Sequence, residues 1–267
     1  MLYSTATGGG LCGILSPHVK DRSSNVAGAR HDAPGLGASM QVTSNVHALY
    51  GAIFDMDGVI VDTGWAHKQA WAEFARMHGA EFTDELFFRT FGMQNYQIIP
   101  IVLGHEVPPD EIGPMGDWKE QRYRQIVAEK LKAPDGLVAL LTDLKAKGFR
   151  VAVGSSAPKV NIDLVLDRLG IGRFFDTIVF GDMVKLGKPA PDTFLTAADM
   201  LGIPPARCVV VEDAVPGVQA GKAAGMAVVA ITTTRSRQDL ARADLVIDCF
   251  TEVKATDFIR LISPIMS

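Results

Sequence analysis

The sequence predicts an α/β protein in which a doubly wound parallel sheet forms the core and an all-helical segment is inserted after the first strand. Two observations support this architecture. Short apolar runs without polar alternation are separated by segments of helical spacing, which is typical of a parallel sheet covered by helices on both faces. Between the first apolar run, residues 50–54, and the next one, residues 149–156, the patterns are helical only.

The elements follow one another in an order that fits this fold. The first strand is expected at YGAIF, residues 50–54, and the helical patterns of the insert at 66–79, 83–92, 95–104 and 109–132. Further along, helices are expected at 137–148, 159–170, 191–202 and 218–225. The remaining strands are expected at 149–156, 176–181, 207–213, 226–232 and 244–248. This alternation predicts a Rossmann-like sheet.

Three regions differ in composition and pattern. Residues 1–46 are rich in Gly, Ser and Ala, with Tyr3 the only aromatic residue, so we expect a flexible tail. The α/β core is expected to comprise residues 47–62 and 134–267, and a helical cap residues 63–133. The sequence leaves open whether the tail has a function and whether translation begins at Met1 or at Met40.

Composition and charge exclude several classes of function. A net charge of −4 argues against nucleic acid or an anionic membrane as the main partner. The three cysteines, Cys12, Cys208 and Cys249, are far apart and form no CxxC motif, which favours free thiols in a reducing compartment. We find neither an apolar stretch of about 18 residues nor a signal-peptide pattern. A cytoplasmic protein without membrane or nucleic-acid partners is therefore expected.

Polar residues follow the predicted strands where they end. In a doubly wound sheet, ligands bind beyond the carboxyl ends of the strands. The residues expected there are four carboxylates, two hydroxyls and one ammonium, namely Asp55, Asp57, Glu212, Asp213, Ser155, Ser156 and Lys188. Four adjacent carboxylates cannot all ionise beside a single lysine, so a hard divalent cation is required. Mg²⁺, which prefers oxygen ligands, is the expected cofactor.

The same residues form four ordered motifs that resemble a known family. DMDGV, SS, GKP and VED occur in this order at the strand ends and resemble the haloacid dehalogenase superfamily over residues 48–267. The helical insert resembles the subclass I cap of that superfamily. Within it, the segments DMDGVIVDT, KPAPDTF and VEDAVPGVQAGKAAGM are most similar to the β-phosphoglucomutase-like phosphatases.

The resemblance implies a role for each carboxylate. Asp55 would be the nucleophile that forms an aspartyl-phosphate, and it would also bind Mg²⁺. Asp57 would be the general acid and base, with its backbone carbonyl as a further metal ligand. Asp213 would bind Mg²⁺ directly, and Glu212 would bind it directly or through water.

The resemblance also implies a phosphate-binding set. Ser155 would hydrogen-bond to the phosphoryl oxygens, together with the backbone amides of Ser156 and Ala157 at the start of the next helix. Lys188 would neutralise the phosphoryl group and Asp55. Each motif alone has an ordinary structural explanation, such as an acidic turn, a solvated lysine or a helix cap. Their occurrence together and in order favours catalysis.

The motifs narrow the reaction to a phosphatase or a phosphomutase. An aspartate at position 57 distinguishes the chain from the dehalogenases, phosphonatases and P-type ATPases of the superfamily. His67 and Lys119 have spacings similar to cap residues of β-phosphoglucomutases, but Asn95 stands where those mutases carry an arginine. An amide cannot replace the charged, bidentate clamp of an arginine. Hydrolysis is therefore expected, with a sugar phosphomutase as the alternative.

A non-catalytic phosphometabolite-binding protein is a second alternative, which the complete set of motif residues disfavours. The expected partner is a small phosphate ester, such as a sugar or polyol phosphate. A side-chain set that includes His67, Trp71, Gln94, Lys119 and Tyr123 is expected to line the substrate site. The resembled group suggests a monomer, but nothing in the sequence identifies the substrate or the oligomeric state.

Overall fold

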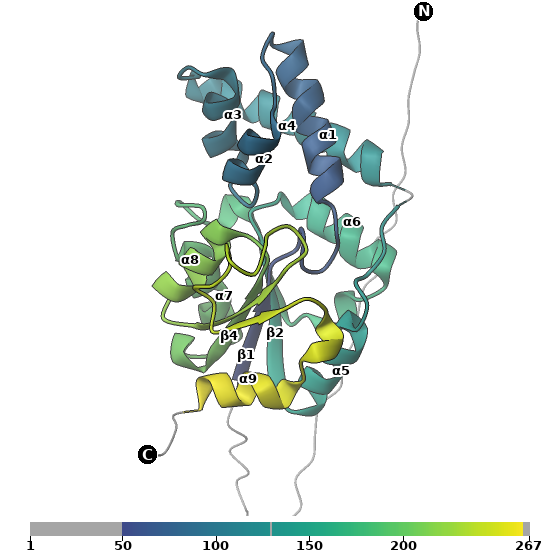
Figure 1. Cartoon of the computed structure of the whole chain (residues 1–267), viewed down its shortest axis with the longest axis vertical. Helices are drawn as coiled ribbons and strands as arrows, with labels where there is room; N and C mark the ends of the chain where they lie inside the picture. The colour runs from purple at the N-terminus through teal and green to yellow at the C-terminus, as the bar shows by residue number, and fades with distance from the viewer. Residues whose placement is uncertain (1–49, 129, 264–267) are drawn as a thin grey trace, which may run out of the picture. The chain divides into compact units, whose positions relative to one another are not determined.

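A single parallel sheet forms the centre of the protein (Figure 1). The computed structural model describes residues 50–128 and 130–263, so the predicted tail lies outside the described residues. In this part of the chain six strands pair in the order β3-β2-β1-β4-β5-β6. They are β1 (Tyr50–Phe54), β2 (Phe149–Gly154), β3 (Thr177–Val179), β4 (Cys208–Glu212), β5 (Ala227–Ile231) and β6 (Leu245–Ile247). The predicted fold class is confirmed.

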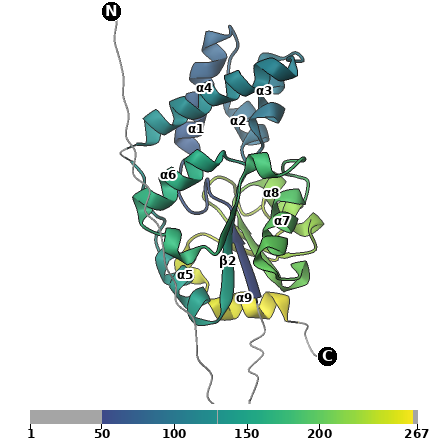
Figure 2. The same cartoon turned by 180° about the vertical axis from the view of Figure 1, so that it is seen from behind.

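Helices cover both faces of this sheet, as its apolar strands require. They are α5 (Leu137–Ala146), α6 (Lys159–Leu169), α7 (Asp192–Leu201), α8 (Val215–Ala223) and α9 (Ala255–Ile262). Short 3₁₀ turns lie at Gly172–Phe174, Gly181–Met183, Pro205–Arg207 and Phe250–Glu252. Figure 2 shows the sheet between α5 and α6 on one side and α7 and α8 on the other.

Alternate residues of β1 enter two separate hydrophobic clusters. Phe54 is buried with Leu140 of α5 and Phe258 of α9, whereas Ile53 is buried with Phe194 of α7. This alternation follows from the period of two along a strand. Because both faces of β1 are buried, the strand is held firmly, and so is the residue that follows it.

The insert between β1 and β2 is helical, as predicted. Residues 64–127 contain α1 (Gly64–Met77), α2 (Asp84–Thr90), α3 (Asn95–Leu103) and α4 (Pro109–Val127). Trp71 and Phe74 of α1 form a hydrophobic cluster with residues of α3. Trp65, near the start of the same helix, is 39% exposed instead and lies against Lys130, with 5.1 Å from Nζ to the ring.

Three polar contacts join the insert to the sheet and its helices. Ser156 Oγ donates to Gly92 O at 2.8 Å, and Gln94 Nε2 donates to Gly181 O at 2.6 Å. Arg235, after β5, donates to the carbonyl of Phe88, and its guanidinium lies 4.7 Å from the Phe88 ring. Insert and sheet belong to one compact unit, so the predicted separate cap stays a prediction.

Among residues 50–128 and 130–263, no helix has both the length and the hydropathy that crossing a membrane requires.

Candidate active site

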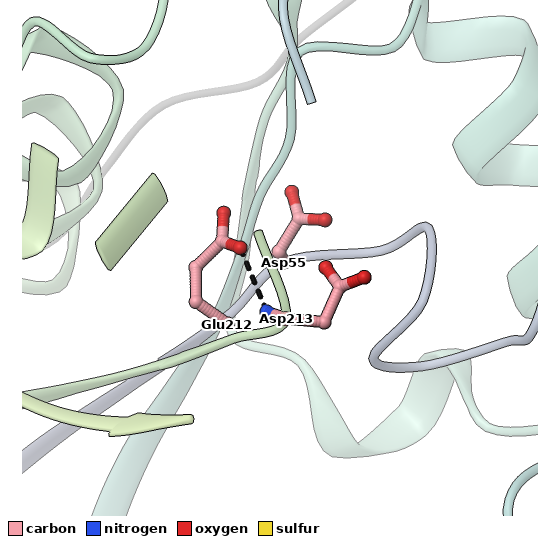
Figure 3. Close-up of side chains that lie close together, drawn as sticks. All are labelled: Asp55, Glu212 and Asp213. Carbon is pink, nitrogen blue, oxygen red and sulfur yellow. Dashed lines mark hydrogen bonds between the residues drawn. The ribbon is translucent and has the colours of Figure 1, made fainter. Parts of the chain in front are cut away.

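Four charged residues of the predicted set meet at the carboxyl edge of the sheet. Asp55 follows β1, while Glu212 and Asp213 lie at the end of β4, the strand next to β1 (Figure 3). The Asp55 amide donates to Val211 O at 3.0 Å, so the two strand ends are held in register. Lys188 reaches the same point from the loop before α7. The structure therefore brings together residues that are up to 158 positions apart in the sequence.

Lys188 is the cation of this cluster. Its side chain is fully buried, and Nζ lies 2.6 Å from Asp55 Oδ1 and 2.6 Å from Glu212 Oε1. Burial opposes the charge, but the two carboxylates together raise the pKa of Lys188 above its usual range. The side chain is therefore an ammonium ion at every physiological pH.

The carboxyl groups carry more negative charge than one ammonium can balance. Burial raises the pKa of Asp55 to about 7, with Lys188 opposing the rise and Glu212 adding to it. Burial, assisted by Glu212 and Asp55, also raises the pKa of Asp213 well above its usual range. Without a further cation, this cluster holds protons at neutral pH.

The arrangement of the oxygens fits a divalent cation. Asp55, Glu212 and Asp213 each place one oxygen atom within 4.8 Å of the others. Asp213 Oδ1 is buried without a hydrogen-bond partner among the described residues, whereas Oδ2 accepts from Thr234 Oγ1. A buried, unpartnered carboxylate oxygen is costly unless a cation satisfies it. The donor set is oxygen only, which suits Mg²⁺.

Glu212 differs from the two aspartates because its oxygens are already engaged. Oε1 accepts from Lys188, and Oε2 accepts from the backbone amides of Asp213 and Ala214 at 2.8 and 2.9 Å. Helix α8 packs closely over this carboxylate, since a Cβ atom on Gly217 would lie 1.7 Å from Oε1. Glu212 therefore holds Lys188 and the strand end in place.

The turn after Asp57 also depends on a glycine. Gly58 has a φ of +85°, and a Cβ atom there would lie 2.0 Å from Asp213 Oδ2. Any other residue at this position would be strained and would displace the carboxylate. The glycine of the DMDGV motif thus lets the first loop approach the end of β4.

Asp57 lies in a different environment from Asp55. Its Oδ1 accepts hydrogen bonds from Thr63 Oγ1 and, at 3.2 Å, from the hydroxyl of Tyr123, and it lies 3.1 Å from His67 Nε2. Burial opposes the charge, but His67 and the hydrogen bonds lower the pKa of Asp57 below its usual range. The pKa values of the neighbouring Asp55 and Asp57 are therefore shifted in opposite directions, which is typical of acid–base sites.

The three predicted cap residues belong to one hydrogen-bonded chain. Lys119 Nζ lies 2.8 Å from His67 Nδ1 and 2.8 Å from Glu120 Oε1. Asn95 Nδ2 donates to the same Glu120 oxygen at 3.0 Å. Because an ammonium group only donates, His67 Nδ1 is the acceptor, and the imidazole proton is on Nε2. This Nε2–H group lies 3.1 Å from Asp57 Oδ1 but is not aligned for a hydrogen bond.

The predicted phosphate-binding residues lie directly after β2. Ser155 is buried, and its Oγ accepts from the Ala157 amide at 3.1 Å. The Ser156 hydroxyl is directed away from this turn, since it donates to Gly92 O. Ser155, Ser156 and Ala157 line the same cavity as Asp55 and Asp57.

This cavity lies between the sheet edge and the helical insert. It measures about 40 Å³ and is lined by residues that include Asp55, Asp57, His67, Trp71, Asn95, Lys119, Glu120 and Ser155. Gln94 and Tyr123, which were expected to line it, are held elsewhere: Gln94 bonds to Gly181, and the hydroxyl of Tyr123 bonds to Asp57. Neither Gln94 nor Tyr123 therefore lines this cavity, and both side chains form hydrogen bonds within the protein.

Sequence reasoning missed two residues that the structure places at the site. Glu120 accepts hydrogen bonds from Asn95, Lys119 and, at 2.6 Å, from Asn161 of α6. Thr234 donates to Asp213 from the loop after β5. The sequence gives no signal for this buried glutamate, because a Lys-Glu pair within a helix is usually exposed to solvent.

Comparisons with known proteins identify the family. The sequence profile of the haloacid dehalogenase-like hydrolases matches residues 51–225. The chain belongs to this family of hydrolases, which confirms the resemblance of the motifs.

The chain is also similar to individual proteins of known name. Fructose-1-phosphate phosphatase YqaB of Escherichia coli is 34% identical over 66% of this chain and 93% of its own length. Protein SUPPRESSOR OF QUENCHING 1 of Arabidopsis thaliana is 36% identical over 72% of this chain, which spans only 18% of that relative. The crystal structure of β-phosphoglucomutase from Clostridium difficile superimposes with a TM-score of 0.74 at 28% identity, over 80% of this chain and 97% of the other.

Proposed function

We propose that the protein is a Mg²⁺-dependent phosphatase that hydrolyses small phosphorylated metabolites, in particular sugar or polyol phosphates. The observation that carries this proposal is the contrast between two carboxyl groups of one loop. Asp55 lies beside Lys188 in a cluster with room for a cation, and Asp57 lies in a hydrogen-bonded setting that keeps it ionised. This contrast provides a nucleophile and a separate acid–base group.

The reaction then proceeds in two displacements. Lys188 contacts Asp55 Oδ1, which leaves Oδ2 to attack phosphorus and form an aspartyl-phosphate while the ester oxygen departs. Asp57 takes up a proton from the monoanionic phosphate ester as it binds and passes it to the departing oxygen. Binding of the phosphate adds negative charge next to Asp57 and raises its affinity for this proton. In the second displacement Asp57 takes a proton from water, which attacks phosphorus, and Asp55 is released as a carboxylate.

Residues of this chain are also available to bind the metal ion and the phosphoryl group. The carboxylates of Asp55 and Asp213 and the carbonyl of Asp57 would hold Mg²⁺, with Glu212 reaching it through water. The ion would neutralise oxygens of the transferred group. Ser155 and the amides of Ser156 and Ala157, together with Lys188, would bind the remaining oxygens.

A phosphatase is favoured over a phosphomutase because of the position of Asn95. A mutase must hold a second phosphate at the cap, but the Asn95 amide donates to Glu120 and carries no charge. The phosphatase relative from Escherichia coli acts on fructose 1-phosphate by its name. We further propose that residues 63–133 act as the cap, and that the chain works as a monomer in a reducing, cytoplasmic compartment, which suits the free thiols of Cys208 and Cys249.

A phosphate-release screen tests this function. We expect Mg²⁺-dependent release of phosphate from at least one sugar or polyol monophosphate, and loss of activity when a chelator is added. The same plate follows conversion of β-glucose 1-phosphate to glucose 6-phosphate with a trace of the bisphosphate. Isomer formation without phosphate release would establish the mutase instead, and neither activity in a folded protein would support a binding protein.

Stabilisation by Mg²⁺ is expected to increase with pH. The pKa of Asp55 is about 7 in the folded, metal-free protein and near 3.8 when the chain is unfolded. The folded state therefore holds the extra proton between these values, and its stability falls as pH rises through 7. Mg²⁺ binds the ionised carboxylate, so the rise in Tm that it causes should be larger at pH 8 than at pH 6. Thermal melts with and without Mg²⁺ at matched ionic strength measure this, and an equal rise at both pH values contradicts it.

A further inference from the structure

The end of the cavity that faces the insert contains a buried ion pair. Lys119 and Glu120 are 2% and 4% exposed, and both line the cavity that holds Asp55 and Asp57. Lys119 Nζ lies 2.8 Å from Glu120 Oε1, so the positive charge is balanced inside the protein. A lysine that is already paired attracts a substrate anion much less than a free one.

A second donor of Lys119 is also engaged. Its ammonium group donates to His67 Nδ1, and it lies 5.0 Å from the Trp71 ring and 5.7 Å from the Tyr123 ring. Rings at these distances interact favourably with a cation and occupy its remaining side. Two of the three ammonium hydrogens of Lys119 are therefore directed at protein groups, and two aromatic rings flank the charge.

Glu120 has one acceptor position left. A carboxylate offers about four lone-pair positions. Three of them receive Asn95 Nδ2, Lys119 Nζ and Asn161 Nδ2 at 3.0, 2.8 and 2.6 Å. The fourth can accept a hydrogen from a substrate hydroxyl. A carboxylate or a phosphate dianion has no hydrogen to donate to this position, and the paired Lys119 offers it no free positive charge.

We propose that Glu120 is a specificity-determining residue that restricts the site to phosphate monoesters whose far end bears only hydroxyl groups. Bisphosphates and phosphorylated acids are disfavoured because Lys119, already paired with Glu120, offers their second anion no free positive charge in a buried site. This inference rests on the proposed phosphatase function and narrows its substrate class to neutral sugar and polyol monophosphates.

A matched pair of substrates tests this inference. Sorbitol 6-phosphate and 6-phosphogluconate are open chains of equal length that differ at carbon 1, where one bears a hydroxyl and the other a carboxylate. We expect the wild type to show a kcat/KM at least about tenfold higher for sorbitol 6-phosphate. Glu120→Gln leaves Lys119 without its partner, so the ratio should fall by about tenfold or more. A merely structural loss would lower both activities and leave the ratio unchanged.

Two variants provide controls. Glu120→Asp keeps the charge and should keep the preference for the neutral substrate. Asp117→Asn removes one charge from an exposed position of the same helix and should leave the ratio unchanged. An unchanged ratio in Glu120→Gln, or wild-type preference for 6-phosphogluconate, overturns the inference.

Failure of the proposed function gives a different result. If the wild type hydrolyses neither substrate nor a chromogenic phosphate ester, the proposed function fails. Calorimetric binding of the two compounds then tests the charge argument by itself, and equal affinity overturns it. If Glu120→Gln does not fold, as judged by circular dichroism, the inference is tested by the wild type alone. Preference for sorbitol 6-phosphate supports it, and preference for 6-phosphogluconate overturns it.

Discussion

Asp55→Asn is expected to lower kcat for phosphate release by at least about 10⁴-fold, because an amide oxygen cannot form the covalent intermediate. The substitution preserves shape, and its oxygen can still accept the hydrogen bond from Lys188 that Asp55 Oδ1 accepts at 2.6 Å. The loss should therefore appear in kcat while the protein stays folded. Single-turnover assays with radiolabelled substrate should detect no phosphorylated protein.

Asp62→Asn is the matched control for this experiment. Asp62 belongs to the same DMDGVIVD segment, but its side chain is exposed. Its replacement by the amide should leave kcat within about twofold, as expected for a surface substitution. If Asp55→Asn kept more than a few per cent of the wild-type rate in a preparation free of wild-type enzyme, Asp55 would not be the nucleophile.

Lys188→Met should reduce the free energy of unfolding by about 3–5 kcal/mol and abolish activity. The lysine is fully buried and is the partner of both Asp55 and Glu212. Its removal leaves two buried carboxylates without a counter-charge, which is the costly way to break a buried ion pair. Denaturant unfolding of the metal-free protein measures this change, with phosphate release as the second readout.

Lys222→Met provides the comparison for that variant. Lys222 also contacts a carboxylate, at 2.7 Å from Asp244 Oδ1, but about a third of each side chain is exposed. A solvent-exposed pair contributes roughly 0–1 kcal/mol, so this substitution should have a small effect. Equal destabilisation by the two substitutions would mean that the buried cluster is not the source of the loss.

The strands and most helices were predictable because each carries a local signal. The apolar runs around β1, β2 and β4 have no polar alternation, and turn residues separate them from helical spacing. Helix α9 (Ala255–Ile262) was missed although Phe258 is buried against α5. Its eight residues are strongly amphipathic, so the sequence did carry a signal for this helix.

The site was predictable to the extent that chain order and sheet topology determine it. Asp55, Ser155 and Asp213 follow strands that are neighbours in a doubly wound sheet, so their meeting follows from the fold. The partners of Asp57 and Lys119 could not be predicted in this way. Glu120 and Asn161 come from α4 and α6, and only the tertiary packing of these helices brings them together.

The contacts between the insert and the sheet bear on the rate of the enzyme. A cavity of about 40 Å³ has room for a few water molecules but not for a hexose phosphate. We therefore expect each turnover to require the contacts of Ser156, Gln94 and Arg235 to break and form again. Each such bond contributes about 1 kcal/mol, because water replaces it when it opens. We therefore predict that exit of the product is a conformational event on the microsecond-to-millisecond scale, which would place an upper limit on kcat that is independent of the chemistry at Asp55.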